Sequence, residues 1–185
     1  MNKLLAGALI AALTATTACS GSNRAARAAN PAPCPNIVVL AEAARFVEFD
    51  GQETLDDVAY SGEITNVSTS CRYFEDRPID QQLDISFAFG KGPKGAEGEK
   101  YFKYWVAVTR KDREVIAKKE FIVPADFKDE RVVVVTTEEV DKIVIPRHDA
   151  EVSGLNFEII VGFSVTPEQA IFNRSGKSLK FPHLK

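Results

Sequence analysis

Few side chains in this sequence could do chemistry. There are two histidines, and His183 lies almost at the C-terminus. The other histidine belongs to a local acidic set: Glu138, Glu139, Asp141, His148, Asp149 and Glu151. Clustered oxygens suit a hard cation, but the set lacks the register of an EF-hand loop. We therefore interpret it as a solvated acidic edge, and such charges also discourage edge-to-edge strand pairing.

Nucleophilic catalysis has little support. A serine triad would need an exposed serine beside His148 and a carboxylate, and no G-x-S-x-G turn is present to expose one. The glycine-rich stretch GKGPKGAEG, 90–98, lacks the spacing of a phosphate-binding loop and opens no helix. We interpret it as a flexible hairpin loop. We predict no catalytic, cofactor-binding or metal-binding residue, with an enzyme that uses the set around His148 kept as an alternative.

The N-terminus differs from the rest of the chain. Lys3 precedes an apolar run from Leu4 to Leu13, and small residues then follow up to Ala18. This pattern is typical of a secretory signal peptide. The run has about half of the roughly 20 residues that a permanent membrane-spanning helix needs. We therefore predict a signal peptide over residues 1–18.

The next residue is the first of three cysteines, Cys19, in the stretch TTACSG, 16–21. These residues resemble the lipobox of bacterial lipoproteins. The resemblance implies that a diacylglyceryl group is attached to the Cys19 thiol, that a signal peptidase cuts just before it, and that the new amine is acylated, for example with palmitate. In enterobacterial lipoproteins of this kind, a residue such as Ser20 after the cysteine permits sorting to the outer membrane, facing the periplasm. Cleavage by the ordinary signal peptidase, which would release a soluble periplasmic protein, remains the alternative.

The segment that follows Cys19 has the composition of a flexible tether. Residues 20–33, SGSNRAARAANPAP, are small and polar and show no hydrophobic periodicity. Such a composition favours a flexible linker. We therefore predict a lipidated N-terminus and tether over residues 19–33, followed by a folded domain over residues 34–185.

The other two cysteines, Cys34 and Cys71, fall at the start of that domain and after a predicted strand. Export would place them in an oxidising compartment, where such a pair commonly forms a disulfide. A bridge closing this loop would stabilise the fold by about 4 kcal/mol. We predict the bridge, with two buried free thiols as the alternative.

The folded domain is predicted to be rich in strands. In LDISFAFG, 83–90, the apolar residues alternate with smaller or polar ones, and NFEIIVGFSV, 156–165, shows nearly the same alternation. Period two is typical of half-buried strands. Further strands are expected over 37–40, 44–49, 58–67, 102–109, 115–123, 131–136 and 142–145. About seven to nine strands without interleaved helices favour an antiparallel β-sandwich.

Two local patterns refine this prediction. Thr166, Pro167 and Gln169 suit the N-cap, first-turn and capping-box positions of a short C-terminal helix. Gly62, Ile64 and Asn66 resemble the G-x-hydrophobic-x-N strand of immunoglobulin-like domains in bacterial envelope proteins. That resemblance implies an immunoglobulin-like sandwich.

The composition and charge of the chain limit the classes of function to be expected. The chain has 185 residues, 45% of them hydrophobic, and a net charge of -3 with both signs interspersed. Because no basic stripe is present, we expect no nucleic-acid partner. We expect a non-enzymatic binding or assembly module, held to membrane lipid through Cys19 and contacting another envelope protein. The alternative is a carrier of lipid or another apolar ligand, with a cavity lined by Phe87, Phe89 and Phe163.

Overall fold

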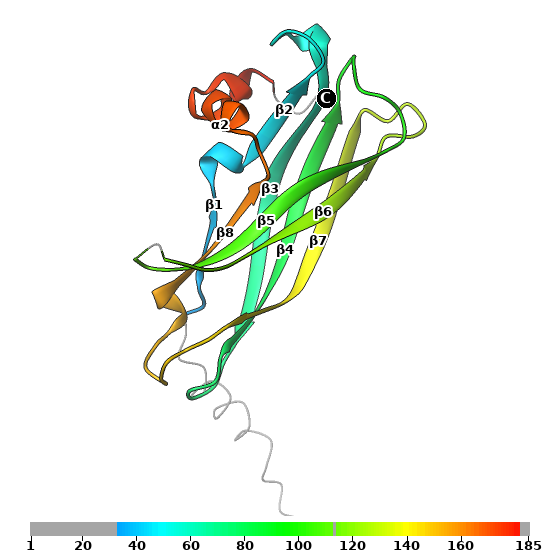
Figure 1. Ribbon diagram of the computed structural model, residues 1–185. Helices are drawn as coiled ribbons and strands as arrows, with labels where there is room; N and C mark the ends of the chain where they lie inside the picture. Colours follow the sequence, from blue (N-terminus) through cyan, green and yellow to red (C-terminus); the bar gives the residue numbers. More distant parts are fainter. Residues whose placement is uncertain (1–32, 113, 182–185) are drawn as a thin grey trace, which may run out of the picture.

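The computed structural model describes residues 33–112 and 114–181, and they form two packed four-stranded sheets (Figure 1). The first sheet has the order β2-β3-β4-β7, with bounds Arg45–Phe49, Val58–Arg72, Ile79–Lys91 and Val133–Ile145. The second has the order β1-β8-β5-β6, with bounds Asn36–Val39, Phe157–Phe163, Glu99–Arg110 and Val115–Asp126. The predicted all-β sandwich is confirmed.

The strand order differs in detail from the antibody arrangement, in which strands A, B, E and D face C, F and G. Here β3 and β4 stay in one sheet as an antiparallel hairpin, and the chain then crosses to the second sheet for the β5-β6 hairpin. It returns for β7 and crosses again for β8. One pair, β1 with β8, is parallel, which the long chain between these two strands allows.

The core lies between the inner faces of the two sheets. Leu83, Ile85, Phe87 and Phe89 of β4 are 0% exposed, so the alternation predicted for this strand is confirmed. The inner face of β8 supplies a matching row, Phe157, Ile159, Val161 and Phe163. Burial of these two rows is the main force that holds the sheets together.

Some predicted boundaries were wrong. The segments 131–136 and 142–145 are parts of one strand, β7, because its polar middle keeps the alternation between inner and outer faces. The stretch 90–98 is not a hairpin loop, because β4 and β5 belong to different sheets. Cys71 lies within β3 rather than after it.

The predicted C-terminal helix is α2, Pro167–Arg174. Its capping box is confirmed: the Gln169 amide donates to Thr166 Oγ1 at 3.2 Å, and the Thr166 amide donates to Gln169 Oε1 at 2.9 Å. Short 3-10 turns complete the fold: η1, Ala41–Ala43; η2, Leu55–Asp57; η3, Gly154–Asn156; and η4, Lys177–Lys180. No helix in the described part of the chain is long and apolar enough to cross a bilayer.

The molecule is elongated, with two distinct ends (Figure 1). The basal end holds Pro33, Cys34, the β3-β4 turn and η3. The distal end holds η2, the 92–98 loop and the β6-β7 loop. The 15 residues of β3 run from one end to the other, which corresponds to roughly 45 Å.

Candidate functional site

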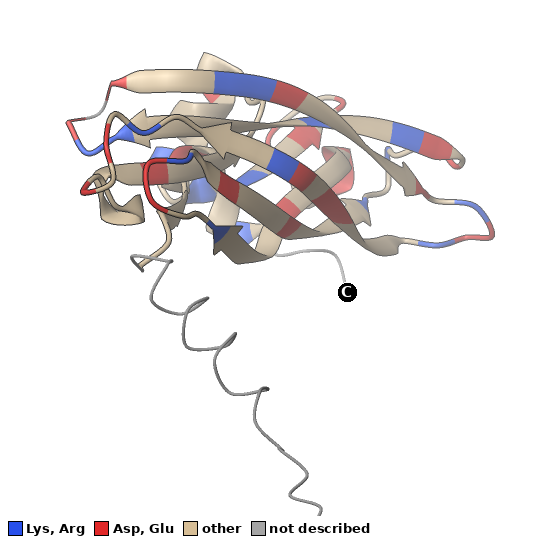
Figure 2. Ribbon diagram, turned by 90° about the horizontal axis from the view of Figure 1, so that it is seen from below, with Lys and Arg blue, Asp and Glu red and all other residues tan. Residues whose placement is uncertain are grey.

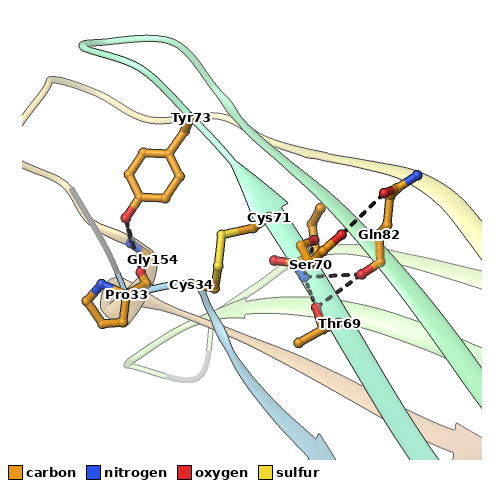
Figure 3. The surroundings of a disulfide bond; sticks show 9 residues. Pro33, Cys34, Thr69, Ser70, Cys71, Tyr73, Gln82 and Gly154 are labelled. Atoms are coloured by element: carbon orange, nitrogen blue, oxygen red, sulfur yellow. Dashed lines mark hydrogen bonds between the residues drawn. A yellow bond between two sulfur atoms is a disulfide. The ribbon is translucent and has the colours of Figure 1, made fainter. Parts of the chain in front are cut away.

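The basal end is built around the predicted disulfide, which is confirmed. Cys34 and Cys71 are bonded, with their Cα atoms 5.9 Å apart (Figure 3). Cys34 lies two residues before the start of β1 in the second sheet, whereas Cys71 lies in β3 of the first sheet. The bridge therefore joins the two sheets at the point where the described chain begins.

Tyr73 adds a second clamp beside the bridge. Its side chain is 2% exposed, and its hydroxyl donates to the Pro33 carbonyl at 3.0 Å and accepts from the Gly154 amide at 3.3 Å. Figure 3 shows this hydroxyl between the two backbone segments. A Cβ atom at Gly154 would lie 2.4 Å from the Pro33 carbonyl oxygen, so only glycine allows this close approach.

Arg147 holds the neighbouring loops in place. Its guanidinium donates to the carbonyls of Val152 at 2.6 Å, Ala150 at 2.6 Å and Arg77 at 3.0 Å. The same group lies 4.8 Å from the centre of the Tyr73 ring, a cation–π distance. Sequence reasoning missed both Tyr73 and Arg147, because the contacts of Tyr73 with Pro33 and Gly154, and those of Arg147 with Arg77 and Tyr73, join residues far apart in the chain.

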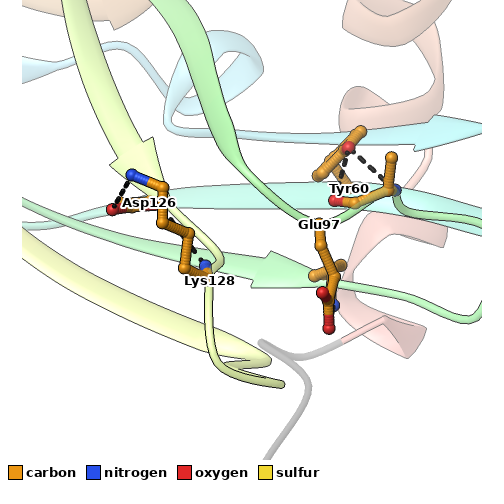
Figure 4. Close-up of polar contacts among 6 residues, drawn as sticks. Tyr60, Glu97, Asp126 and Lys128 are labelled. Carbon is orange, nitrogen blue, oxygen red and sulfur yellow. Dashed lines mark hydrogen bonds and ion pairs between the residues drawn. The ribbon is translucent and has the colours of Figure 1, made fainter.

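At the distal end, the 92–98 loop is fastened to β3 rather than free. The Tyr60 hydroxyl donates to the Ala96 carbonyl at 3.1 Å and accepts from the Ala96 amide at 3.0 Å (Figure 4). The Lys94 amide donates to the Val58 carbonyl at 3.0 Å. A Cβ atom at Gly92 would lie 2.2 Å from that same carbonyl oxygen. The expected flexible loop is therefore corrected to a tightly bonded one.

Charges at this end are paired locally. Lys128 Nζ lies 3.0 Å from Asp126 Oδ2 (Figure 4). Lys91 Nζ lies 3.9 Å from Glu97 Oε1. The hydrogen bond from Lys128 lowers the pKa of Asp126, and the same contact raises the pKa of Lys128. Over the whole ribbon, acidic and basic segments follow one another along strands and loops (Figure 2).

The acidic set around His148 is spread over different faces. Glu138 lies on the inner face of β7 opposite Ile85, whereas Glu139 lies on the outer face opposite Asp84. His148 and Asp149 follow the strand, and Asp149 Oδ1 accepts from the amides of Glu151 and Val152 at 2.9 and 3.0 Å. Within residues 33–112 and 114–181, no three His, Cys, Asp or Glu side chains are placed to hold a metal ion.

One part of the set does gather. The pKa of Glu139 is raised, chiefly by the negative charge of Asp141 and by a hydrogen bond with it, and further by burial and by Asp84. Three carboxylates therefore lie near one another on the exposed outer side of β7 and β4, and the structure shows no ion pair for any of them within residues 33–112 and 114–181. This edge agrees with the solvated acidic edge expected from the sequence.

The three phenylalanines expected to line a ligand cavity fill the core instead. The Phe87 ring centre lies 5.8 Å from that of Phe89 and 5.6 Å from that of Phe163, and Phe89 lies 6.0 Å from Phe163. Their exposed fractions are at most 1%. These rings therefore pack against one another and line no internal cavity.

A surface groove opens where the two sheets diverge. It has a volume of about 430 Å³ and lies between β6 and β7. Its walls are residues 117–119 and Phe121 of β6 and residues 139–144 of β7, with Val106 and Val108 of β5 at its floor. We call it the β6-β7 groove. Sequence reasoning did not find it, because it depends on how far one edge strand stands from another.

Cys19 and the predicted signal peptide lie outside the described residues, so their predictions stay as stated. Comparisons with known proteins add no family: no family model, no curated protein and no solved structure matches the chain. The functional argument therefore depends on the residues and geometry above.

Proposed function

We propose that this protein is a bacterial envelope lipoprotein, anchored through acylated Cys19, whose β-sandwich binds or assembles other envelope components without catalysis. The observation that carries the proposal is the stretch TTACSG, 16–21, placed after an apolar leader and before a polar tether. Two or three acyl chains anchor a protein stably, whereas a single chain gives only marginal membrane binding. The outer membrane, facing the periplasm, is the proposed location.

The geometry of the domain supports a tethered binding role. The described part of the chain begins at the basal end, where the Cys34–Cys71 bridge, Tyr73 and Arg147 hold the neighbouring segments in place. A lipid anchor joined to this end leaves the distal loops and both sheet edges free to meet a partner. A disulfide between the sheets also suits an oxidising compartment such as the periplasm.

The packed core favours a surface-binding module over an internal carrier. A lipid carrier needs a continuous apolar cavity, typically several hundred Å³ in volume. Here Phe87, Phe89 and Phe163 occupy the position where such a cavity was expected. The large open space at the β6-β7 groove reaches the surface instead.

The anchor is tested by metabolic labelling with an alkyne analogue of palmitate, followed by membrane fractionation. We expect label on the wild-type protein and none on Cys19→Ala, which should move to the soluble periplasmic fraction. The matched control is the double variant Cys34→Ser with Cys71→Ser, which should keep the label. An unlabelled wild-type protein, or a Cys19→Ala protein still bound to membranes, would refute the anchor.

The binding role is tested by photo-crosslinking in intact cells. A benzophenone amino acid is placed in turn at the exposed positions Lys94, Ala117 and Ala150, which sample the distal loops, the groove and the basal end. We expect discrete crosslinked species from at least one of these regions. Monomer alone from every position, with the protein correctly localised, would contradict a binding or assembly role.

A further inference from the structure

The free edge of β7 differs from the other three sheet edges. β1 has four residues, β2 is covered by α2, and β6 contains Pro124, which has no amide hydrogen to offer. These are recognised ways of protecting an edge from pairing. β7 has 13 residues and no proline, and its edge carries two milder devices, a shift in register with β4 near Asp141 and the inward-pointing Glu138.

The inner face of β7 is also incompletely covered. Val134, Thr136 and Glu138 point between the sheets but are only half-buried, whereas the inner residues of the neighbouring β4 are fully buried. β6 and β7 diverge from their common loop at the distal end (Figure 1). The inner side of β7 is therefore least covered from Val134 to Glu138, whereas Val140 and Ile145, nearer the basal end, are buried.

The groove has an apolar floor with charges held to the sides. Val106, Val108 and Val140 are each at most 7% exposed and form its base. Lys119 of β6 lies opposite the inner residue Val106, and its Nζ lies 5.0 Å from the centre of the Phe121 ring, so its alkyl stem contributes apolar surface to the wall. Lys118 is directed to the outer face, where its Nζ lies 4.5 Å from the centre of the Trp105 ring.

The outer rim of the same edge is anionic. Asp84, Glu139 and Asp141 lie together on the outer side of β4 and β7, and none of them takes part in an ion pair among the described residues. Their mutual repulsion raises the pKa of Glu139. A strand added to β7 would present alternate side chains to the groove and to this rim.

We propose that β7 accepts an extended segment of a partner protein as an added strand, with apolar side chains entering the β6-β7 groove and lysine or arginine facing the anionic rim. This inference rests on the proposed binding function and names its partner surface. Backbone hydrogen bonds to β7 would supply affinity, and the alternation of apolar and basic residues would supply specificity. The surface is a candidate site for a basic amphipathic strand.

Charge complementarity favours such a partner over a second copy of this chain. A second β7 would bring the three acidic residues of that strand, Glu138, Glu139 and Asp141, together with one lysine, Lys142, against the same set. Like charges directly opposite one another across strands are destabilising. The acidic residues therefore act against self-pairing and for a cationic strand.

The test uses the purified full chain and two synthetic probes of about ten residues, one alternating valine with lysine and one alternating valine with glutamate. Binding is measured by biolayer interferometry at low salt and at about 0.5 M NaCl. We expect the lysine probe to bind in a salt-sensitive way and the glutamate probe not to bind. Hydrogen exchange should then slow at the amides of β7 and stay unchanged at those of β2.

Two variants locate the binding. Glu139→Lys should lower the affinity for the lysine probe by about tenfold. Glu97→Lys, at the distal end, should leave that affinity unchanged. Ala117→Arg fills the groove from β6 and should abolish binding, whereas the exposed Ala150→Arg at the basal end should not. All four positions are exposed, so thermal unfolding should confirm that each variant folds.

Several results would overturn the inference. These are equal binding of both probes, protection of amides outside β7, or a response to Glu97→Lys as large as that to Glu139→Lys. Sedimentation showing a dimer that Ala117→Arg dissociates would also overturn it, because the occupant would then be a second copy. None of these results affects palmitate labelling of Cys19 or crosslinking at Lys94, so failure here is distinguishable from failure of the proposed function.

Discussion

Val47 and Val135 lie on the two opposite edge strands of one sheet, two residues apart in register. Both lie on the outer face, Val47 on β2 and Val135 on β7, yet their exposed fractions are 5% and 70%. The difference comes from α2 and the C-terminal segment, which cover β2 and leave β7 open. The same residue type on the same sheet is thus a core residue on one side of the molecule and a surface residue on the other.

The covered side is held by specific polar contacts as well as by packing. Gln169 of α2 donates to the Val47 carbonyl at 3.4 Å, and Asn173 donates to the carbonyls of Arg45 and Glu42 at 2.7 and 2.8 Å. The disulfide further fixes β1 to β3 on this side. The β6-β7 side lacks comparable contacts in the described residues. Substitutions on the covered side should therefore lower the free energy of unfolding more than substitutions on the β6-β7 side.

The largest effect is expected from the disulfide. Replacing both cysteines, Cys34→Ser with Cys71→Ser, should lower the free energy of unfolding by about 4 kcal/mol, because the unfolded chain regains the entropy of a loop spanning 37 positions. Denaturant unfolding of the full chain measures the loss. Cys19→Ser is the control and should unfold like the wild type. A loss below about 1 kcal/mol would mean that the bridge contributes little to the covered side.

The next effect concerns the cover of β2. Asn173→Ala removes two hydrogen bonds to backbone carbonyls and should cost about 2 kcal/mol. Arg174→Ala, on the same helix, breaks only an exposed ion pair with Glu42 and should cost less than about 0.5 kcal/mol. Chemical denaturation compares the two variants. Equal losses would show that α2 does not protect β2 through these bonds.

The two valines test the comparison directly. Val47→Ala should lower stability by about 1.5 kcal/mol, because two buried methyl groups are lost. Val135→Ala should stay within about 0.5 kcal/mol of the wild type, because its side chain is already in water. Thermal unfolding of both variants measures the difference. If Val135→Ala were as destabilising as Val47→Ala, β7 would be covered in solution.

The smallest effect is electrostatic. The pKa of Glu139 is raised above its ordinary value of 4.5 in the folded protein, so the folded state holds this proton more tightly than the unfolded chain. The free energy of unfolding should therefore decrease as the pH rises from the ordinary pKa of this carboxyl to its raised pKa in the folded protein. Glu139→Gln should remove this dependence and raise the thermal midpoint slightly at neutral pH, more at low salt than at high salt. No change relative to the control Glu97→Gln would contradict repulsion at the rim.

A structural feature could be predicted from the sequence when neighbouring residues determine it. The strand at 83–90 and the capping box at Thr166 were predictable, because alternation and capping are properties of neighbouring residues. The disulfide followed from the compartment implied by the leader. The continuity of β7 was missed, because its polar middle alternates on a face that is only half covered.

The candidate site was less predictable than the fold. The clamp at the base needs Tyr73 to meet Pro33 and Gly154, which are 40 and 81 positions away. The bonds of the 92–98 loop need Tyr60, 36 positions away. The groove arises from the divergence of two strands, which no single strand encodes. Such features depend on tertiary distances that local patterns do not specify.

The position of the Cys34–Cys71 bridge has a mechanical consequence. If the N-terminus is pulled toward a membrane while a partner holds the far side, tension arriving at Cys34 passes through the covalent bond into β3. The short β1 is thereby bypassed, and the load falls on the long hydrogen-bonded ladders that β3 forms with β2 and β4. Reduction of the bridge would shift that load to the four residues of β1, which should then peel from β8 at a much lower force.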